Sequence, residues 1–317
     1  MRVVITGGAG FIGSHLCEAL LTRGDEVICV DNLASGRVDN IRHLLESPRF
    51  LLDVHDIRNP LAISGQVDAV ANLASLASPP GYLRQPVFTL TTGSVGTKNA
   101  LDLAAAHGAR FVQASTSEVY GDPAVHPQRE DYWGNVNPTG PRSVYDEAKR
   151  YGEALVAAYA REGVDAGIVR IFNTYGPRMR LDDGRVVTNF IAQALQGRPL
   201  TVYGDGKQTR SLCYVSDLVR GLIAMIDNSV PGPVNLGNPQ EMTVQQLAEL
   251  TRDIVGSTSE IEYLPLPQDD PTRRRPDIRK AQDELGWTPH VDVAEGLAKT
   301  IEWNIANGAR EGRLVDA

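Results

Sequence analysis

The first half of the chain alternates short apolar runs with longer amphipathic segments. The short runs predict strands near Val3–Thr6, Val27–Val30, Phe50–Leu52, Ala69–Leu73, Phe111–Ala114 and Ala166–Arg170. The longer segments predict helices over Phe11–Arg23, Pro86–His107 and Tyr145–Glu162. This alternation is typical of a parallel sheet with helices on both faces and ligands at the carboxyl ends of its strands. We therefore expect an α/β fold with a Rossmann-like, doubly wound parallel sheet.

After Phe172 the pattern changes to short strands and separate helices, with more Pro and Gly. This change predicts a second, smaller α/β lobe that closes over a substrate. We expect a sheet domain made of residues 1–173, to which residues 204–239 return. The lobe is then formed by residues 174–203 and 240–317.

Three glycines follow the first predicted strand with the spacing G-x-x-G-x-x-G. Gly7 permits a tight turn, Gly10 allows the backbone to approach a pyrophosphate, and Gly13 allows close helix–strand packing. Phe11 and Ile12 begin the helix that leaves this turn. A strand, a glycine turn and a helix in this order predict a dinucleotide-binding site.

The second predicted strand ends in Asp31, followed by Asn32. A carboxylate at this position can accept both ribose hydroxyls and repels a 2′-phosphate, so NAD is favoured over NADP. Arg37 lies nearby in the sequence and keeps NADP open as an alternative.

Polar and small residues at later strand ends add further candidates for cofactor contacts. Asp56, followed by Ile57, can accept the adenine amino group, and Thr92 can reach the nicotinamide ribose. The residues expected beneath that ribose are Leu73, Ala74 and Ser75. Each alone also fits an ordinary cap or a solvent-facing residue. Their occurrence at successive strand ends favours the cofactor site.

Composition narrows the class of protein. The chain has 317 residues, 42% of them hydrophobic, and a formal net charge of -8. These values indicate a large core and argue against general nucleic-acid binding. Cys17, Cys29 and Cys213 are too scattered for a disulfide framework or a metal cluster. No segment reaches the roughly 20 apolar residues of a membrane span, and the first strand leaves no room for a signal peptide. We expect a cytoplasmic protein without a metal.

Tyr145 and Lys149 are four residues apart in Ser143-Val-Tyr-Asp-Glu-Ala-Lys149. On the predicted helix this spacing places both side chains on one face. An ammonium beside a phenol favours the phenolate, so we expect the pKa of Tyr145 to fall from about 10 toward the working pH. Such a tyrosine can take a proton from a sugar hydroxyl while hydride leaves the same carbon. The spacing also occurs by chance on amphipathic helices, and the glycine turn is what favours the catalytic interpretation.

Several longer motifs carry a resemblance over nearly the whole chain. They are Ala77-Ser-Pro-Pro80, Thr116-Ser-Glu-Val-Tyr-Gly-Asp-Pro123, Tyr132-Trp-Gly-Asn-Val-Asn-Pro138, Gly140-Pro-Arg-Ser-Val-Tyr-Asp-Glu147, Arg170-Ile-Phe-Asn-Thr-Tyr-Gly-Pro-Arg-Met179, Asp183-Gly-Arg-Val-Val187, Leu200-Thr-Val-Tyr-Gly-Asp-Gly206, Gln208-Thr-Arg210 and Asp269-Asp-Pro-Thr-Arg-Arg-Arg-Pro-Asp-Ile278. With the glycine turn, they resemble the extended, sugar-nucleotide-modifying branch of the short-chain dehydrogenase/reductase superfamily. Within it, the chain is similar to the UDP-glucuronic acid decarboxylases, which make UDP-xylose.

The resemblance implies a redox cycle on the sugar. Tyr145 deprotonates the C4 hydroxyl while hydride passes to NAD⁺, CO₂ then leaves from C5 of the 4-keto sugar, and hydride returns to C4. It also implies that Glu118, Thr116 and Ser117 act on the sugar, with Glu118 as the candidate acid/base. Arg274 corresponds to the arginine that contacts the reacting sugar, while the roles of Arg273 and Arg275 stay open. The residues expected to hold UDP and part of the sugar are Asn173, Arg185, Asn189, Tyr203, Gln208 and Arg210.

Relatives of this kind are commonly homodimers joined by a four-helix bundle. In this chain the corresponding helices are Pro86–His107 and Tyr145–Glu162. The sequence departs from the broader superfamily at Gly93-Ser94, where Asn is often found at the first position. We expect this departure to weaken one hydrogen bond that fixes the backbone near the cofactor and to leave the chemistry intact.

Three alternative functions remain open. A UDP-glucuronic acid 4-epimerase also grips a C5 carboxylate and is the hardest to separate from a decarboxylase. A dTDP-glucose 4,6-dehydratase shares the Tyr–Lys pair, but it normally carries Asp-Glu where this chain has Ser117-Glu118. A non-catalytic NAD-sensing protein would have little reason to keep Tyr145, Lys149 and Glu118 together.

Overall fold

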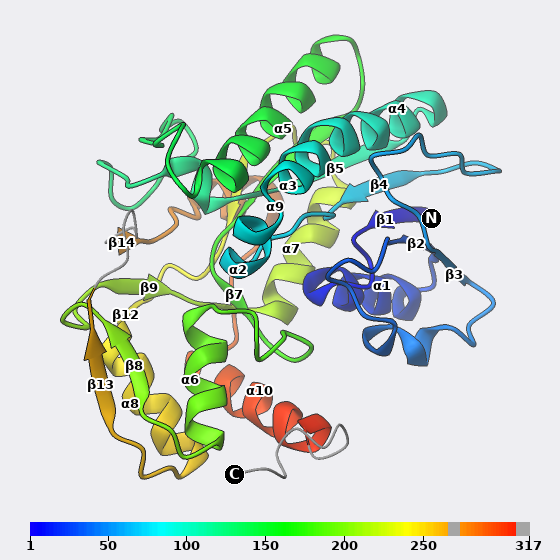
Figure 1. Cartoon of the computed structure of the whole chain (residues 1–317). Helices are drawn as coiled ribbons and strands as arrows, with labels where there is room; N and C mark the ends of the chain where they lie inside the picture. Colours follow the sequence, from blue (N-terminus) through cyan, green and yellow to red (C-terminus); the bar gives the residue numbers. More distant parts are fainter. Residues whose placement is uncertain (266–272, 309–317) are drawn as a thin grey trace.

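A seven-stranded parallel sheet forms the centre of the computed structural model, which describes residues 1–265 and 273–308. The strand order is β11-β6-β5-β4-β1-β2-β3, so the expected Rossmann-like, doubly wound sheet is confirmed (Figure 1). The strands are β1 (Arg2–Thr6), β2 (Glu26–Val30), β3 (Phe50–Asp53), β4 (Ala69–Asn72), β5 (Arg110–Thr116), β6 (Ala166–Ile171) and β11 (Val234–Leu236). All six predicted strands are present, with ends displaced by at most two residues.

Two apolar cores lie on opposite faces of this sheet, because successive strand residues point to opposite sides. Val3 and Ile5 belong to one core, which includes residues of α1 (Phe11–Arg23) and α7 (Val215–Asp227). Val4 belongs to the other, which includes residues of α4 (Thr97–His107) and α5 (Ser143–Arg161). The sheet is therefore covered on both faces, and the loops at the carboxyl ends of its strands are left to form a site.

The predicted single helix over Pro86–His107 is wrong in one respect. The structure divides it into α3 (Pro86–Thr91), a π-helical turn η3 (Thr92–Gly96) and α4. The wide turn contains Gly93 and Gly96, and glycine holds a regular helix poorly because its backbone is the most flexible. Thr92 therefore begins a π turn within a longer helical segment.

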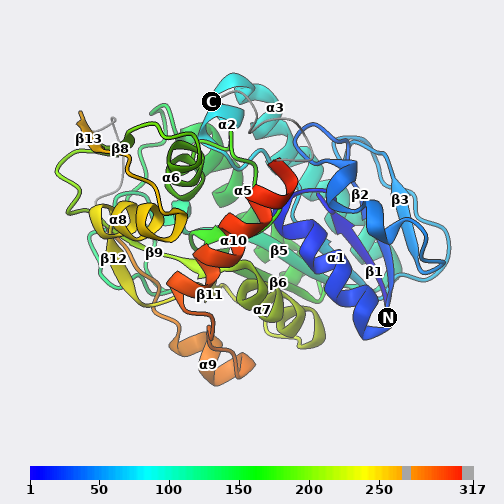
Figure 2. The ribbon, with the colours of Figure 1, turned by 90° about the horizontal axis from the view of Figure 1, so that it is seen from below.

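The remaining segments pack beside the carboxyl edge of the sheet. They include α6 (Val186–Leu195), β8 (Leu200–Tyr203), α8 (Val244–Val255), β13 (Ile261–Leu264) and α10 (Val293–Gly308). Figure 2 shows α8 and α10 from below, with α10 crossing between α8 and α1. β8 pairs with β13, and β9 (Thr209–Ser211) lies between β12 (Glu241–Thr243) and β14 (Arg273–Arg274). The division into two domains at the boundaries given above stays a prediction.

The other elements are short. They are η1 (Val38–Asn40), η2 (Arg42–Leu44), α2 (Pro79–Arg84), η4 (Ser117–Tyr120), the pair β7 (Thr174–Tyr175) and β10 (Cys213–Tyr214), and α9 (Arg279–Leu285). Among the residues described, no helix has the length and apolar character needed to cross a membrane.

Candidate active site

A cavity of about 730 Å³ opens at the carboxyl ends of the strands. It is lined by all the residues that the sequence assigned to the cofactor, the catalysis and the UDP-sugar. They are Gly7, Gly10, Phe11, Ile12, Gly13, Asp31, Asn32, Asp56, Ile57, Leu73, Ala74, Ser75, Thr92, Thr116, Ser117, Glu118, Tyr145, Lys149, Asn173, Arg185, Asn189, Tyr203, Gln208, Arg210 and Arg274. The structure thus brings the candidates together, while their individual roles stay predictions.

The glycine turn forms one wall of this cavity. Gly7 has a φ of 71°, a conformation that favours glycine. A side chain at Gly13 would collide with the carbonyl oxygen of Gly7, so this glycine allows the helix to pack against the turn itself. α1 begins at Phe11, and its first amides have no acceptor within the helix. This arrangement suits a pyrophosphate.

Asp31 lies at the end of β2, with both carboxylate oxygens held by the backbone. Oδ1 accepts a hydrogen bond from Leu33 N at 2.8 Å, and Oδ2 accepts one from Ala9 N at 3.0 Å. Burial raises the pKa of this carboxyl, although the two hydrogen bonds oppose the rise. Each oxygen retains a further lone pair, so the carboxylate can still accept ribose hydroxyls.

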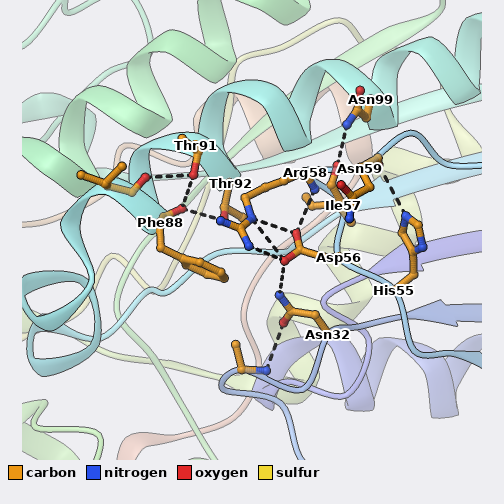
Figure 3. A network of polar contacts seen from close by, with 12 residues as sticks. Asn32, His55, Asp56, Ile57, Arg58, Asn59, Phe88, Thr91, Thr92 and Asn99 are labelled. Atoms are coloured by element: carbon orange, nitrogen blue, oxygen red, sulfur yellow. Dashed lines mark hydrogen bonds and ion pairs between the residues drawn. The ribbon is translucent and has the colours of Figure 1, made fainter.

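Asp56 lies in a network of polar contacts that includes Asn32, the residue after Asp31 (Figure 3). Its Oδ2 accepts hydrogen bonds from Arg58 Nη2 at 2.7 Å and from Asn32 Nδ2 at 3.1 Å. The hydrogen bonds from Arg58 lower the pKa of Asp56 to about 2. The Arg58 guanidinium in turn lies 4.2 Å from the centre of the Phe88 ring. Asp56 is thus fixed as an anion, and its contact with adenine stays a prediction.

The Tyr145–Lys149 pair lies at the start of α5, and both side chains are buried. Lys149 Nζ donates a hydrogen bond to Ala114 O at 2.7 Å and lies 5.8 Å from the centre of the Tyr145 ring. Burial lowers the pKa of Lys149 to about 8. Burial also raises the pKa of Tyr145, and a hydrogen bond with Thr116 offsets only part of the rise.

This result corrects the expectation that Lys149 lowers the pKa of Tyr145 in this site. Charge on a buried phenolate is poorly solvated, and this cost of burial is the largest influence on the pKa of Tyr145. The pair is correctly placed on one face of the helix.

Glu118 lies on η4, where two arginines bind the same carboxylate oxygen. Its Oε2 accepts hydrogen bonds from Arg142 Nη2 at 2.6 Å and from Arg274 Nη2 at 3.2 Å. Burial acts to raise the pKa of Glu118, but the charges of Arg274 and Arg142 outweigh it and hold the pKa below its usual value. Arg274 Nη1 also donates to the carbonyl oxygen of Ser117. The cluster can hold an anionic group beside the tyrosine.

Among the three consecutive arginines, Arg274 is the one that lines the cavity. Its side chain is 2% exposed, whereas Arg273 is exposed and Arg275 points toward Glu241, with Nη1 3.6 Å from Oε2. The first part of their motif, residues 269–272, lies outside the described residues, as do residues 309–317 of the predicted lobe.

The predicted UDP ligands line the part of the cavity near α6 and β8. Arg185 forms a two-point ion pair with Asp183, in which Nη2 lies 2.9 Å from Oδ2. Asn189 Nδ2 donates to Gly184 O at 3.3 Å, and Gln208 Nε2 donates to Tyr203 O at 2.5 Å. Tyr203 is 39% exposed, which leaves its ring available for stacking.

Three further residues near Tyr145 were missed by the sequence reasoning. The Tyr82 ring stacks on the Tyr145 ring, with centroids 5.3 Å apart. Asp146 is buried, and burial together with the Glu118 charge raises its pKa to about 7. Arg142 could have been found, because it precedes Tyr145 by one helical turn in a quoted motif. The stacking of Tyr82 has no local signal, since α2 meets α5 only in the folded chain.

Comparisons with known proteins agree with this geometry. Residues 3–237 match the family described as the NAD dependent epimerase/dehydratase family. A protein of Danio rerio named UDP-glucuronic acid decarboxylase 1 is 55% identical over 303 residues, covering 95% of this chain and 72% of the relative. Its namesake from Xenopus tropicalis is 56% identical with the same coverage. The structure of a dTDP-glucose 4,6-dehydratase from Streptomyces venezuelae with NAD bound is 30% identical, with a TM-score of 0.89 over 98% of each chain.

Proposed function

This chain belongs to the NAD dependent epimerase/dehydratase family, and we propose that within it the protein is an NAD-dependent decarboxylase that converts UDP-glucuronate to UDP-xylose. One observation in the site carries this proposal. Arg142 and Arg274 converge on one oxygen of Glu118 in the cavity that contains Tyr145. Two cations around one carboxylate leave positive charge for a second anion, as a uronate requires.

The residues present fit NAD. The turn at Gly7 and the start of α1 suit its pyrophosphate, and Asp31 suits an unphosphorylated ribose. NAD, when bound, supplies the reversible hydride exchange at C4 of the sugar. A carboxylate as buried as Asp31 would repel a 2′-phosphate, which supports NAD over NADP.

Tyr145 moves the proton of the C4 hydroxyl. The Tyr145 hydroxyl is hydrogen-bonded to the Thr116 side chain, so the hydroxyls of these two residues can hold the C4 oxygen of the sugar between them. Lys149, anchored on Ala114 O, contributes a nearby positive charge that stabilises the phenolate as it forms. Tyr145 returns the same proton when the C4 hydroxyl is restored.

The carboxylate-bearing end of the sugar belongs near Glu118 in this proposal. At the 4-keto stage the bond from C5 to the carboxylate breaks, its electron pair passes toward the ketone oxygen, and CO₂ leaves. A proton then adds to C5, so each turnover consumes one proton. Arg142 and Arg274 can stabilise the negative charge before and after this step. Glu118, held ionised by the same arginines, first accepts a proton before it can donate one.

The decisive experiment is incubation of the purified protein with UDP-glucuronate, followed by mass and stereochemical analysis of the product. Release of CO₂ with formation of UDP-xylose supports the proposal. An isomer of unchanged mass identifies a 4-epimerase instead, and loss of water identifies a dehydratase. A substrate labelled with ¹³C in the carboxyl group makes the first outcome unambiguous, because the label must leave as CO₂.

The assembly belongs to the same proposal. Large apolar side chains are exposed on α2, α3, η3 and α5, namely Leu83, Val87, Leu90, Val95 and Tyr151. Val87 is 70% exposed, which supports burial against a second copy through a four-helix bundle. Light scattering of the protein and of Val87→Glu distinguishes a dimer from a monomer.

The cysteines are free and buried, which supports a cytoplasmic setting.

A further inference from the structure

The π turn η3 meets the catalytic helix α5 at Gly93 and Ala148. A Cβ atom placed on Gly93 would lie 2.7 Å from Ala148 Cβ and 3.1 Å from Ala148 O. Non-bonded carbon atoms pack at about 3.5–4.0 Å. The Ala148 methyl cannot rotate away, and the residue is 3% exposed. Any side chain at position 93 therefore forces the two segments apart.

This contact lies beside the catalytic pair. Ala148 precedes Lys149, whose Nζ reaches Ala114 O at 2.7 Å, and it follows Tyr145 by one helical turn. On the other segment, Thr92 precedes Gly93 and lines the cavity. The Gly93–Ala148 contact thus sets how deeply α5 lies against the wall that faces the cofactor site.

One turn further along α5, the packing is less tight. A Cβ on Gly152 would lie 3.6 Å from Gln113 Nε2 and 3.8 Å from Gly93 O, which are ordinary van der Waals distances. The same helix therefore accepts a methyl group at Gly152 while excluding one opposite Ala148. The steric requirement is specific to a single point of contact.

We infer that Gly93 and Ala148 form a matched pair that positions Tyr145 and Lys149 for catalysis; this inference rests on the function proposed above. The methyl group of Ala148 occupies the space that a side chain at position 93 would need. An asparagine at position 93 then requires glycine at position 148. The glycine at position 93 is thus matched by the methyl group on the facing helix.

The test is a double-mutant cycle on these two positions. Gly93→Ala should lower kcat for UDP-xylose formation roughly 10- to 100-fold, the cost of misplacing reacting groups by about 1 Å. KM for UDP-glucuronate should stay close to that of the unmodified protein, because α6 and β8 are untouched. Adding Ala148→Gly should restore most of kcat, and Ala148→Gly should likewise make Gly93→Asn tolerable. Gly152→Ala, a methyl on the same helix, is the matched control and should leave kcat unchanged.

The pH profile separates positioning from general stability. In Gly93→Ala, the acid limb of kcat/KM should move, because forcing α5 away from η3 changes the burial that sets the pKa values of Tyr145 and Lys149. In the double variant the limb should return. A Gly93→Ala protein with unchanged kcat and pH profile, or one that Ala148→Gly does not rescue, would overturn the inference.

The outcome can be distinguished from failure of the proposed function. If the unmodified protein makes no UDP-xylose, the activity proposal fails, and the pair is then judged by Tm. Gly93→Ala alone should lower Tm, and Ala148→Gly should recover part of the loss in that background only. Additive Tm changes would contradict the pairing. If Gly93→Ala does not fold, a folded double variant supports the pair and an unfolded one refutes it.

Discussion

Nη2 of Arg274 lies 3.2 Å from Oε2 of Glu118, and the two residues are 156 positions apart in the chain. Gln128 fixes the backbone beside Arg274 through two hydrogen bonds to Arg275. Gln128 Oε1 accepts one from Arg275 N at 2.8 Å, and Gln128 N donates one to Arg275 O at 2.9 Å. Gln128 is fully buried. These bonds hold the backbone beside Arg274 where its side chain meets Glu118.

Arg274→Gln should slow decarboxylation strongly while UDP binds almost as before. Removing the guanidinium leaves Arg142 as the arginine bound to Glu118. It also removes a positive charge that, in the proposed mechanism, stabilises the negative charge on the ketone oxygen. Loss of one such donor costs about 10²–10³-fold in kcat. Calorimetry with UDP, which lacks the sugar, measures the binding. Arg210→Gln is the control, and this variant should bind UDP more weakly than the unmodified protein. If Arg274→Gln lowered UDP affinity as steeply as it lowers kcat, Arg274 would be assigned to the phosphates instead.

Tyr145→Phe should abolish most turnover and leave the fold intact. The ring remains stacked on Tyr82, at a centroid distance of 5.3 Å, so packing is preserved while the hydroxyl is lost. Removal of a general base typically lowers the rate about 10²–10⁴-fold. Steady-state rates and the Tm of both proteins give the comparison. Near-normal activity in the variant would assign the proton transfer to another group.

The purified protein should turn over UDP-glucuronate with little or no added NAD, and NADH should not accumulate. Hydride taken from C4 returns to C4, so the cofactor is regenerated in each cycle. Asp31→Ala should create a requirement for added NAD, because the carboxylate held by Ala9 N and Leu33 N is lost. Absorbance of NADH during turnover measures both effects. Stoichiometric NADH would indicate a simple dehydrogenase.

The sheet and the glycine turn could be predicted because their signals are local. Apolar runs fix the strands, and the turn at Gly7 requires a positive φ of 71°. The cofactor candidates could be predicted because the carboxyl ends of parallel strands meet at one edge, whereas the sugar candidates came from the resemblance that the quoted motifs carry. These features need no knowledge of how distant segments pack.

The remaining features depend on tertiary packing. Asn32 donates to Asp56, and Tyr82 stacks on Tyr145, only because segments far apart in the sequence meet in the folded chain. The close approach of Gly93 to α5 likewise exists only in the folded chain, and no periodicity in the sequence indicates it. The raised pKa of Tyr145 was mispredicted because spacing shows the neighbouring ammonium but not the depth of burial.

Asp146 gives the fold a pH-dependent weakness that can be measured. The carboxyl is 6% exposed, and its Oδ1 atom has no hydrogen-bond partner among the described residues. Burial, reinforced by the charge of Glu118, raises its pKa from 3.8 to about 7. The folded state thus binds more protons than the unfolded state between these two pH values. The contribution of Asp146 to the free energy of unfolding therefore falls as pH rises from about 4 to about 7.

Asp146→Asn removes this titration. The Tm of the variant minus that of the unmodified protein should increase from pH 4 to pH 7 and level off above pH 7, where Asp146 is ionised in both states. Scanning fluorimetry across this range measures the difference. Asp39→Asn is the control for the loss of a carboxylate at the surface, because the Asp39 side chain is 62% exposed, and the Asp146→Asn difference is read relative to it. A parallel curve for Asp146→Asn would show that Asp146 titrates at its ordinary pH in the folded protein.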